Sequence, residues 1–176
     1  YPASVAAGHL ETRLVQLRTV ATQSVYANSG EAADEMLRIN AEVEAEIWQM
    51  IDTLAGSTAV DPDDVRALRN GYAELNLHLS TLAEMVRDPA VTAPQIGTYV
   101  NEHVYPLMVG LLDADRSALD QTTNAVNDVY TAVNDACRQT IFVSWILIIA
   151  VIIALFVYLA ILHRKTRREE HLTSEL

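Results

Sequence analysis

Residues 141–162 read IFVSWILIIAVIIALFVYLAIL, a stretch of 22 residues without one charge. Folded as an α-helix, this stretch extends ~33 Å and covers the ~30 Å hydrocarbon core of a bilayer. A buried helix of a soluble protein normally shows a polar stripe, whereas here only Ser144, Trp145 and Tyr158 interrupt the apolar surface. The stretch therefore predicts one transmembrane helix, and with it a direct contact between this chain and the lipid bilayer.

The residues that flank this stretch predict its orientation. Trp145 and Tyr158 lie near its two ends, where amphipathic rings prefer the lipid headgroups. Four basic residues follow closely: Arg164, Lys165, Arg167 and Arg168. Because positive charges favour the cytoplasmic side of a membrane, we expect residues 163–176 to form a basic cytoplasmic tail. The preceding 140 residues then lie outside the cytoplasm, which we interpret as the periplasm behind a bacterial inner membrane.

The part of the chain before the span is strongly acidic. It contains eight arginines, no lysine and 20 acidic residues, within a whole chain of 12 basic and 23 acidic residues. No basic face is available to neutralise phosphates, so we expect no nucleic-acid partner. The single cysteine, Cys137, excludes an internal disulfide, a cysteine-based redox pair and a cysteine-rich zinc site.

Apolar residues before the span recur at the spacing of helices. Gly and Pro are scarce, with 6 and 5 of 176 residues, which favours an all-α fold. We expect helices over residues 4–27, 31–55, 62–87 and 93–138, the fourth continuing into the span. Because the connections are short, consecutive helices become antiparallel neighbours, and the sequence predicts an up-down-up-down four-helix bundle over residues 1–117.

Each expected helix has an apolar seam whose members are three or four residues apart. Two helix starts are also well marked. Asp61 and Pro62 supply a cap and a proline at the first helical position, and Thr92 with Gln95 matches a capping box. The predicted core residues are Leu10, Leu14, Leu17 and Ala21; Met36, Ile39, Val43, Ile47, Met50 and Leu54; Leu68, Tyr72, Leu75, Leu79, Leu82 and Val86; and Ile96, Val100, Val104, Leu107, Leu111, Ala114 and Ala118.

A proline interrupts the fourth expected helix. Pro106 lacks a backbone donor and its ring clashes with the carbonyl of Glu102, so we expect a kink there. The kink either wraps the helix around the core or serves as a hinge for signalling.

The fourth expected helix is longer than its three neighbours by roughly 30 Å. The excess forms a stalk over residues 118–140, which keeps an apolar stripe and has nothing in this chain to pack on. We expect it to contact another membrane-protein chain, in a homodimer or a host complex, or a segment before Tyr1. Ala150 and Ala154 add a small-residue contact motif within the span. The expected contact residues of the stalk are Ala118, Ala125, Val129, Val133 and Ala136.

The sequence lacks the common catalytic and nucleotide-binding motifs GxxxxGKS/T, GxGxxG, HExxH and GxSxG. Glu74 and His78 are four residues apart and could share a metal, although a solvated pair is the simpler interpretation. His103 with Met108 could ligate haem in a bundle, whereas the span contains no histidine. We therefore expect a non-enzymatic protein without a metal or cofactor.

Arginines are the remaining candidates for a polar site. Arg13 and Arg18 lie on the first expected helix, and Arg66 and Arg69 lie on the third. Guanidinium groups bind carboxylates and other anions bidentately, so these four are candidate contacts for a small anionic ligand. Because the two helices are diagonal in a square bundle, ordinary ion pairs with the many acidic residues are the alternative.

This outline resembles the extracytoplasmic four-helix-bundle sensor domains of bacterial chemoreceptors and histidine kinases. The matching parts are the four helices, the run VYPLMVGLLDADRSALDQ at residues 104–121, the span, and the basic start RKTRREEHLTSEL at residues 164–176. The resemblance implies a dimer whose bundle binds a small ligand or a partner and whose last helix moves relative to the membrane.

A second hypothesis makes the chain a single-span accessory subunit that stabilises a larger photosynthetic or respiratory membrane complex. Its span would pack on lipid and neighbouring spans, and its bundle would brace the outer face of the complex. Tyr1 is not Met, so either a leader was removed or an upstream segment precedes it. A sensor fragment is expected to continue past Leu176 into a signalling domain, whereas an accessory subunit is expected to stop there.

Overall fold

The computed structural model describes residues 2–27 and 29–173, with side chains up to residue 164. These described residues contain no strand, so the all-α prediction is confirmed. The chain divides into an N-terminal unit, residues 1–127, and a C-terminal unit, residues 128–176. The elements are α1 (Pro2–Ala27), α2 (Gly30–Ala55), α3 (Pro62–Arg87), α4 (Ala93–Tyr99), the π-helical turn η1 (Val100–Val104) and α5 (Tyr105–Thr173).

Local hydrogen bonds explain where α2, α3 and α4 begin. The hydroxyl of Ser29 accepts from the backbone of Ala32 at 3.3 Å, and the carboxylate of Asp61 accepts from the backbone of Asp63 at 2.8 Å. At α4, the backbone N–H of Thr92 donates to Gln95 Oε1 at 2.8 Å. Each bond satisfies a donor at a helix N-terminus that has no partner within its own helix. The predicted starts of α3 and α4 are confirmed.

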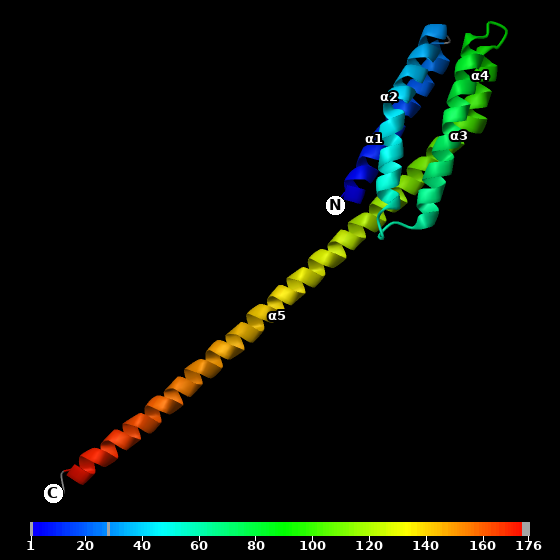
Figure 1. Cartoon of the computed structure of the whole chain (residues 1–176). Helices are drawn as coiled ribbons and strands as arrows, with labels where there is room; N and C mark the ends of the chain where they lie inside the picture. The colour runs from blue at the N-terminus through cyan, green and yellow to red at the C-terminus, as the bar shows by residue number, and fades with distance from the viewer. Residues whose placement is uncertain (1, 28, 174–176) are drawn as a thin grey trace. The chain divides into compact units, whose positions relative to one another are not determined.

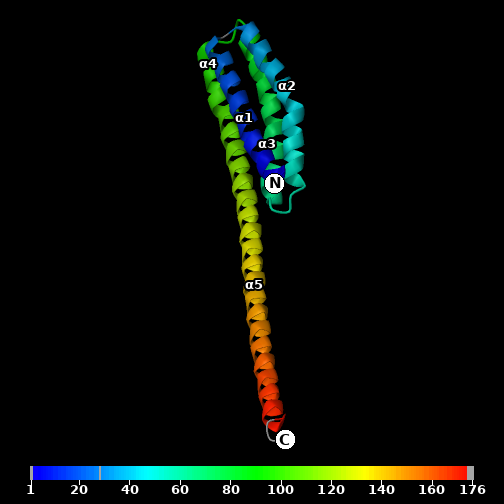
Figure 2. The same cartoon turned by 90° about the vertical axis from the view of Figure 1, so that its left-hand side faces the viewer.

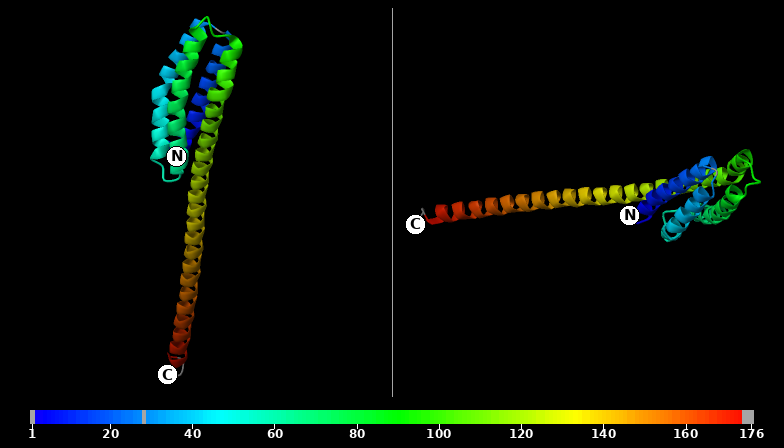
Figure 3. Two further views of the ribbon diagram at one scale, coloured as in Figure 1. Left: turned by 90° about the vertical axis from the view of Figure 1, so that its right-hand side faces the viewer. Right: turned by 90° about the horizontal axis from the view of Figure 1, so that it is seen from above.

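The helices of the N-terminal unit lie side by side around one hydrophobic core (Figures 1 and 2). The connections α1–α2 and α3–α4 lie at one end of the unit, and the α2–α3 connection lies at the other (Figure 3). The predicted seams of α1 and α3 are buried throughout. On α3, the Tyr72 ring meets Trp48 of α2 edge to face, with ring centroids 5.1 Å apart.

The seam of α2 differs from the predicted one. Ile51 is fully buried and Asn40 is 8% exposed, whereas Ile39 and Met50 are only partly buried. Asn40 occupies the core position that the apolar pattern assigned to Ile39, and Ile51 occupies the position assigned to Met50. The buried seam is therefore shifted by one residue at each of these two positions.

The predicted seam of the last helix is confirmed at four positions, since Val104 of η1 and Leu111, Ala114 and Ala118 of α5 are buried. Met108 and the polar residues at positions 115 and 122, which were not predicted, are buried as well. Leu107 is only half-buried. The core therefore extends beyond residue 117, and Ala118, expected at a partner contact, belongs to the interior of this chain because it is fully buried.

Polar contacts also attach the first part of α5 to the start of α3. Asp64 accepts hydrogen bonds from the Ser117 hydroxyl at 2.7 Å and from Gln121 Nε2 at 2.8 Å. Gln121 Oε1 in turn accepts from the backbone N–H of Asp61 at 2.7 Å. These bonds fix the register between the two helices where the hydrophobic core ends.

A π-helical turn precedes Pro106, where the sequence predicted a kink. The backbone N–H of Tyr105 donates to the carbonyl of Val100, five residues earlier, instead of four as in an α-helix. This wider turn directly precedes the proline, where an α-helix would bring the proline ring against the carbonyl of Glu102. The backbone stays helical from α4 through η1 into α5.

Candidate membrane segment and polar sites

The apolar stretch at residues 141–162 is exposed along its whole length. All 22 residues are solvent-exposed, and the most apolar window of this helix has none of its residues buried. The helix is long and apolar enough to cross a membrane, judged by length and composition. Large apolar side chains that are exposed over so long a stretch are typical of a surface that contacts lipid or protein.

The residues predicted to anchor this segment are in part described. Trp145 and Tyr158 are each 61% exposed, and Arg164 is exposed as well. The side chains of Lys165, Arg167 and Arg168 lie outside the described part of the chain.

Most of the expected partner contacts beyond Ala118 are exposed. Val129 and Val133 are 64% and 56% exposed, and Ala125 is half-buried. Further along α5, the remaining expected contacts are all exposed: Ala136, Ala150 and Ala154.

The four candidate arginines do not gather into one site. Arg13 pairs with Glu46 of α2 at 2.7 Å, and Arg69 pairs with Asp52 of α2 at 2.5 Å. Arg66 pairs with Asp63 at 2.7 Å within α3, and Arg18 is exposed on α1. Three of the four arginines therefore follow the ion-pair alternative, and each of these three guanidinium groups contacts a different carboxylate.

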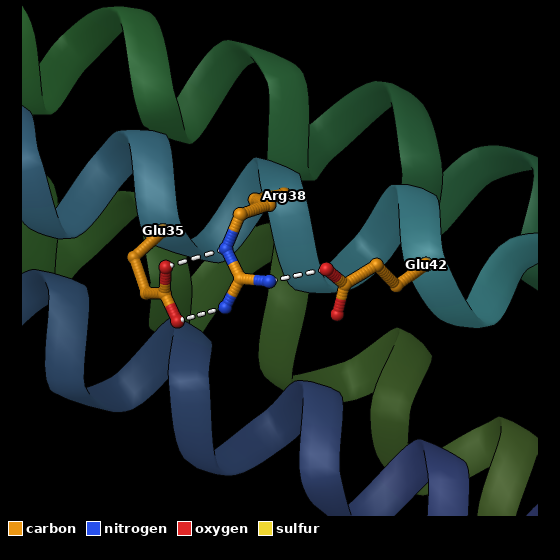
Figure 4. Close-up of polar contacts among 3 residues, drawn as sticks. All are labelled: Glu35, Arg38 and Glu42. Carbon is orange, nitrogen blue, oxygen red and sulfur yellow. Dashed lines mark hydrogen bonds and ion pairs between the residues drawn. The ribbon is translucent and has the colours of Figure 1, made fainter.

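A different arginine lies between two carboxylates. Arg38 donates to Glu35 through Nε at 2.8 Å and through a terminal nitrogen at 2.5 Å, and also to Glu42 (Figure 4). The hydrogen bonds to Arg38 lower the pKa of Glu35, and those to Glu35 raise the pKa of Arg38. Glu35 and Glu42 lie three and four residues from Arg38, a spacing from which these ion pairs could have been predicted. Because all three side chains are exposed, it is a solvated surface network.

An imidazole cluster joins α3 to the π-helical turn. His78 Nδ1 lies 2.6 Å from the hydroxyl of Tyr99, and its Nε2 lies 3.9 Å from Glu74. The ring of His103, within η1, stacks on His78 with centroids 5.2 Å apart and planes 9° apart. Glu74 and His78 had been recognised as a pair, but Tyr99 and His103 join them only through tertiary packing. π-helical turns are frequent at functional positions, which makes this cluster a candidate site.

A carboxyl group is buried in the core of the N-terminal unit. Asp115 of α5 is 1% exposed, and among the described residues neither of its carboxylate oxygens has a hydrogen-bond partner. Burial, with the charge of Glu11 on α1 as a smaller cause, raises the pKa of Asp115 to about 7, although Arg116 opposes the rise. Sequence reasoning missed it, although position 115 continues the spacing of the buried residues.

Metal chemistry has no evident location in the described residues. These residues include no group of three or more His, Cys, Asp or Glu that could hold a metal ion. His103 is exposed whereas Met108 is buried in the core, so the two do not share the environment that an axial haem pair requires.

Comparisons with known proteins do not assign a family to this chain. No family model, no curated protein and no solved structure matches it.

Proposed function

We propose that this chain is a non-enzymatic, single-pass membrane protein whose acidic helical unit lies outside the cytoplasm and serves as an input module of the sensory-receptor type. One observation carries the proposal: residues 141–162 form 22 consecutive uncharged helical residues that are all exposed. In water, exposing so large an apolar surface is unfavourable, whereas a bilayer covers the whole of it.

The orientation of the span rests on charge. Basic residues of the sequence RKTRRE begin directly after the span, and the residues before the span carry the large excess of acids. The positive-inside rule then assigns the C-terminus to the cytoplasm and the N-terminal unit to the outer side of a bacterial inner membrane.

The input role rests on helix continuity. α5 contributes core residues such as Met108 and Leu111 to the N-terminal unit, and it continues without interruption through the apolar residues 141–162. We infer an up-down-up-down order for the four helices, because short connections alternate between the two ends of the unit (Figure 3). A ligand or partner that changes how α5 packs in that unit would thereby change the helix that enters the membrane.

Two measurements on the intact chain test the anchoring and the orientation. After expression in bacteria, the chain should stay with the membranes during alkaline carbonate washing, and its release by that washing would overturn the span. Cys137, the exposed natural cysteine, should react with a membrane-impermeant maleimide in spheroplasts. In a Cys137→Ser background, Ser174→Cys should react only after permeabilisation, and the reverse pattern would overturn the orientation.

Purification from the source membrane tests the input role. An input module should migrate as the chain itself or as a small homo-oligomer. Isolation in a fixed ratio with other membrane proteins would support the accessory-subunit hypothesis instead, for which Ala150 and Ala154 offer a helix-packing motif.

A further inference from the structure

The carboxyl group of Asp115 lies on the side of α5 that joins the core. Leu111, four residues before it, and Ala118, three residues after it, are 2% and 0% exposed, and Asp115 itself is 1% exposed. Neither of its carboxylate oxygens has a hydrogen-bond partner among the described residues. A carboxylate in such a place loses its hydration without compensation, so its presence in the core requires an explanation.

Two buried hydroxyl groups of the same core are treated differently. The hydroxyl of Thr122, on the same side of α5, donates to the carbonyl of Leu119 at 2.9 Å. The hydroxyl of Ser24 on α1 donates to the carbonyl of Ala21 at 2.9 Å. These side chains are satisfied within their own helices and cost little when buried. The carboxyl of Asp115 has no such local partner, so burial alone does not explain it.

Charged groups on three helices surround this part of α5. Glu11 of α1 opposes the ionisation of Asp115, and Arg116, the next residue on α5, favours it. Glu11 and Arg116 pair with each other at 3.5 Å, and the Arg116 side chain is 63% exposed. On α3, the acid bonded to this part of α5 is Asp64, which accepts from Ser117 at 2.7 Å. The two acids add negative charge, and the arginine is shared with one of them.

The contact between α1 and α5 at this level is built from small side chains. In the proposed up-down-up-down order, α1 and α5 run in opposite directions, so the residues before Glu11 lie level with those around and after Arg116. The buried alanines of these two segments are Ala3, Ala6 and Ala7 on α1, and Ala114 and Ala118 on α5. Because an alanine buries less apolar surface than a leucine, it contributes less to holding two helices together. An uncompensated charge is therefore most disruptive to this part of the core.

A proton is the ligand that suits this carboxyl group. A metal ion requires several ligand atoms, and the described residues include no group of three or more His, Cys, Asp or Glu that could hold one. A proton requires one acceptor and no cavity, and the protonated carboxyl carries no net charge into the core. Burial raises the pKa of Asp115 to about 7, so both forms are populated near neutral pH.

We propose that Asp115 is a proton-binding site through which the acidity of the outer compartment controls the packing of α5 on α1. With the proton bound, α5 packs on α1 as described. When the proton passes to water, the ionised carboxylate draws residues 114–122 of α5 away from α1 and toward solvent. This inference rests on the proposed function and names its input, because α5 is the helix that continues through the apolar residues 141–162.

Protection of buried thiols tests the site with the full chain in detergent micelles. In a Cys137→Ser background, Ala118→Cys places a thiol in the α1–α5 contact, and Ala114→Cys is a second probe there. Ala83→Cys on α3 is the matched control, because Ala83 and Ala118 are both fully buried. Dividing the maleimide labelling rate of each probe by that of the control removes the common effect of pH on thiols. From pH ~5.5 to pH ~8.5 this ratio should rise roughly tenfold, and adding Asp115→Asn should keep it low throughout.

The contrary outcomes are distinct. A ratio that stays constant with pH would overturn the proposal, and so would a rise that persists with Asp115→Asn. Equal acceleration at positions 118 and 83 would show that the whole core loosens, which would overturn the specific control of α5. A nearby carboxylate hinders formation of the reactive thiolate, so the direct effect of Asp115 on a thiol has the opposite sign to the expected rise.

Failure of this proposal and failure of the proposed function are distinguishable. The micelle experiment does not depend on the orientation of the chain, whereas the carbonate and spheroplast measurements judge the anchoring alone. A chain that is anchored as proposed but shows a constant labelling ratio would keep its proposed function and lose the proton as its input.

Discussion

Replacing Asp115 by Asn should stabilise this protein at neutral pH and leave its stability nearly unchanged at acidic pH. The carboxyl of Asp115 is 1% exposed, and both of its oxygens lack hydrogen-bond partners among the described residues. An ionised carboxylate in such a place loses its hydration without compensation, whereas the protonated acid and the amide of Asn carry no net charge. The substitution therefore removes the charge while keeping the shape of the side chain.

The size of the effect follows from the pKa of Asp115. Burial raises this pKa from its ordinary value of 3.8 to about 7, which at 1.36 kcal/mol per pH unit corresponds to about 4 kcal/mol. Because the folded state binds the proton more tightly, the free energy of unfolding is unaffected below pH ~4, falls between pH ~4 and ~7, and is lowest above that. The advantage of Asp115→Asn should grow over the same interval.

Urea denaturation of the full chain in detergent micelles measures this difference. With Trp145→Phe as the common background, the fluorescence of Trp48 reports on the N-terminal unit alone. The difference in free energy of unfolding between the parent chain and the Asp115→Asn variant at each pH separates the contribution of residue 115 from those of the other acidic residues. A difference in free energy of unfolding that stays constant between pH 4 and pH 8, or an Asn variant that is less stable at pH 8, would refute the reasoning.

Three further predictions use the same denaturation assay. Tyr72→Phe should raise the free energy of unfolding by about 1 kcal/mol, because the Tyr72 hydroxyl is buried without a hydrogen-bond partner among the described residues; a loss would show that the hydroxyl is satisfied. Tyr99→Phe should lower it by about 1 kcal/mol, since the 2.6 Å bond to His78 is lost, and an unchanged value would count against that bond. Asp64→Ala should lower the free energy of unfolding by about 1–3 kcal/mol, because Asp64 accepts hydrogen bonds from two side chains of α5, including Gln121. An unchanged free energy of unfolding would show that these bonds do not stabilise the α3–α5 contact.

Much of the helical architecture could be predicted because the signals are local. The start of α3 depends on Asp61 and Pro62, two adjacent residues whose effect on the backbone needs no tertiary contact. The same holds for Thr92 with Gln95 at α4. The α1 and α3 seams were also predictable, because the core positions of these two helices are apolar apart from Ser24 and, at Tyr72, largely so.

The buried polar positions could not be recognised from apolar spacing. At position 40 the polar residue occupies the core position, and its apolar neighbour Ile39 satisfies the pattern almost as well; at position 115 a polar residue is buried beside Ala114, which is itself buried as predicted. Recognising either polar residue requires knowing how the helix is rotated against its neighbours, which depends on the packing of the whole unit. The imidazole cluster was missed for a related reason, since His78 and His103 are 25 residues apart and meet only when α3 packs against η1.

The two sides of α1 show how far a periodic pattern can be interpreted. Leu10, Leu14 and Leu17 define the core side so strongly that the threonines and valines opposite them look like ordinary surface residues. Comparison with α2, whose exposed side carries charges at most positions, shows that the exposed side of α1 is almost uncharged. Burying a charged side chain without a partner costs more free energy than burying an uncharged one, because the charge loses its hydration. The spacing of apolar residues therefore indicates contacts within the unit, whereas the distribution of charge limits which outer faces could be covered.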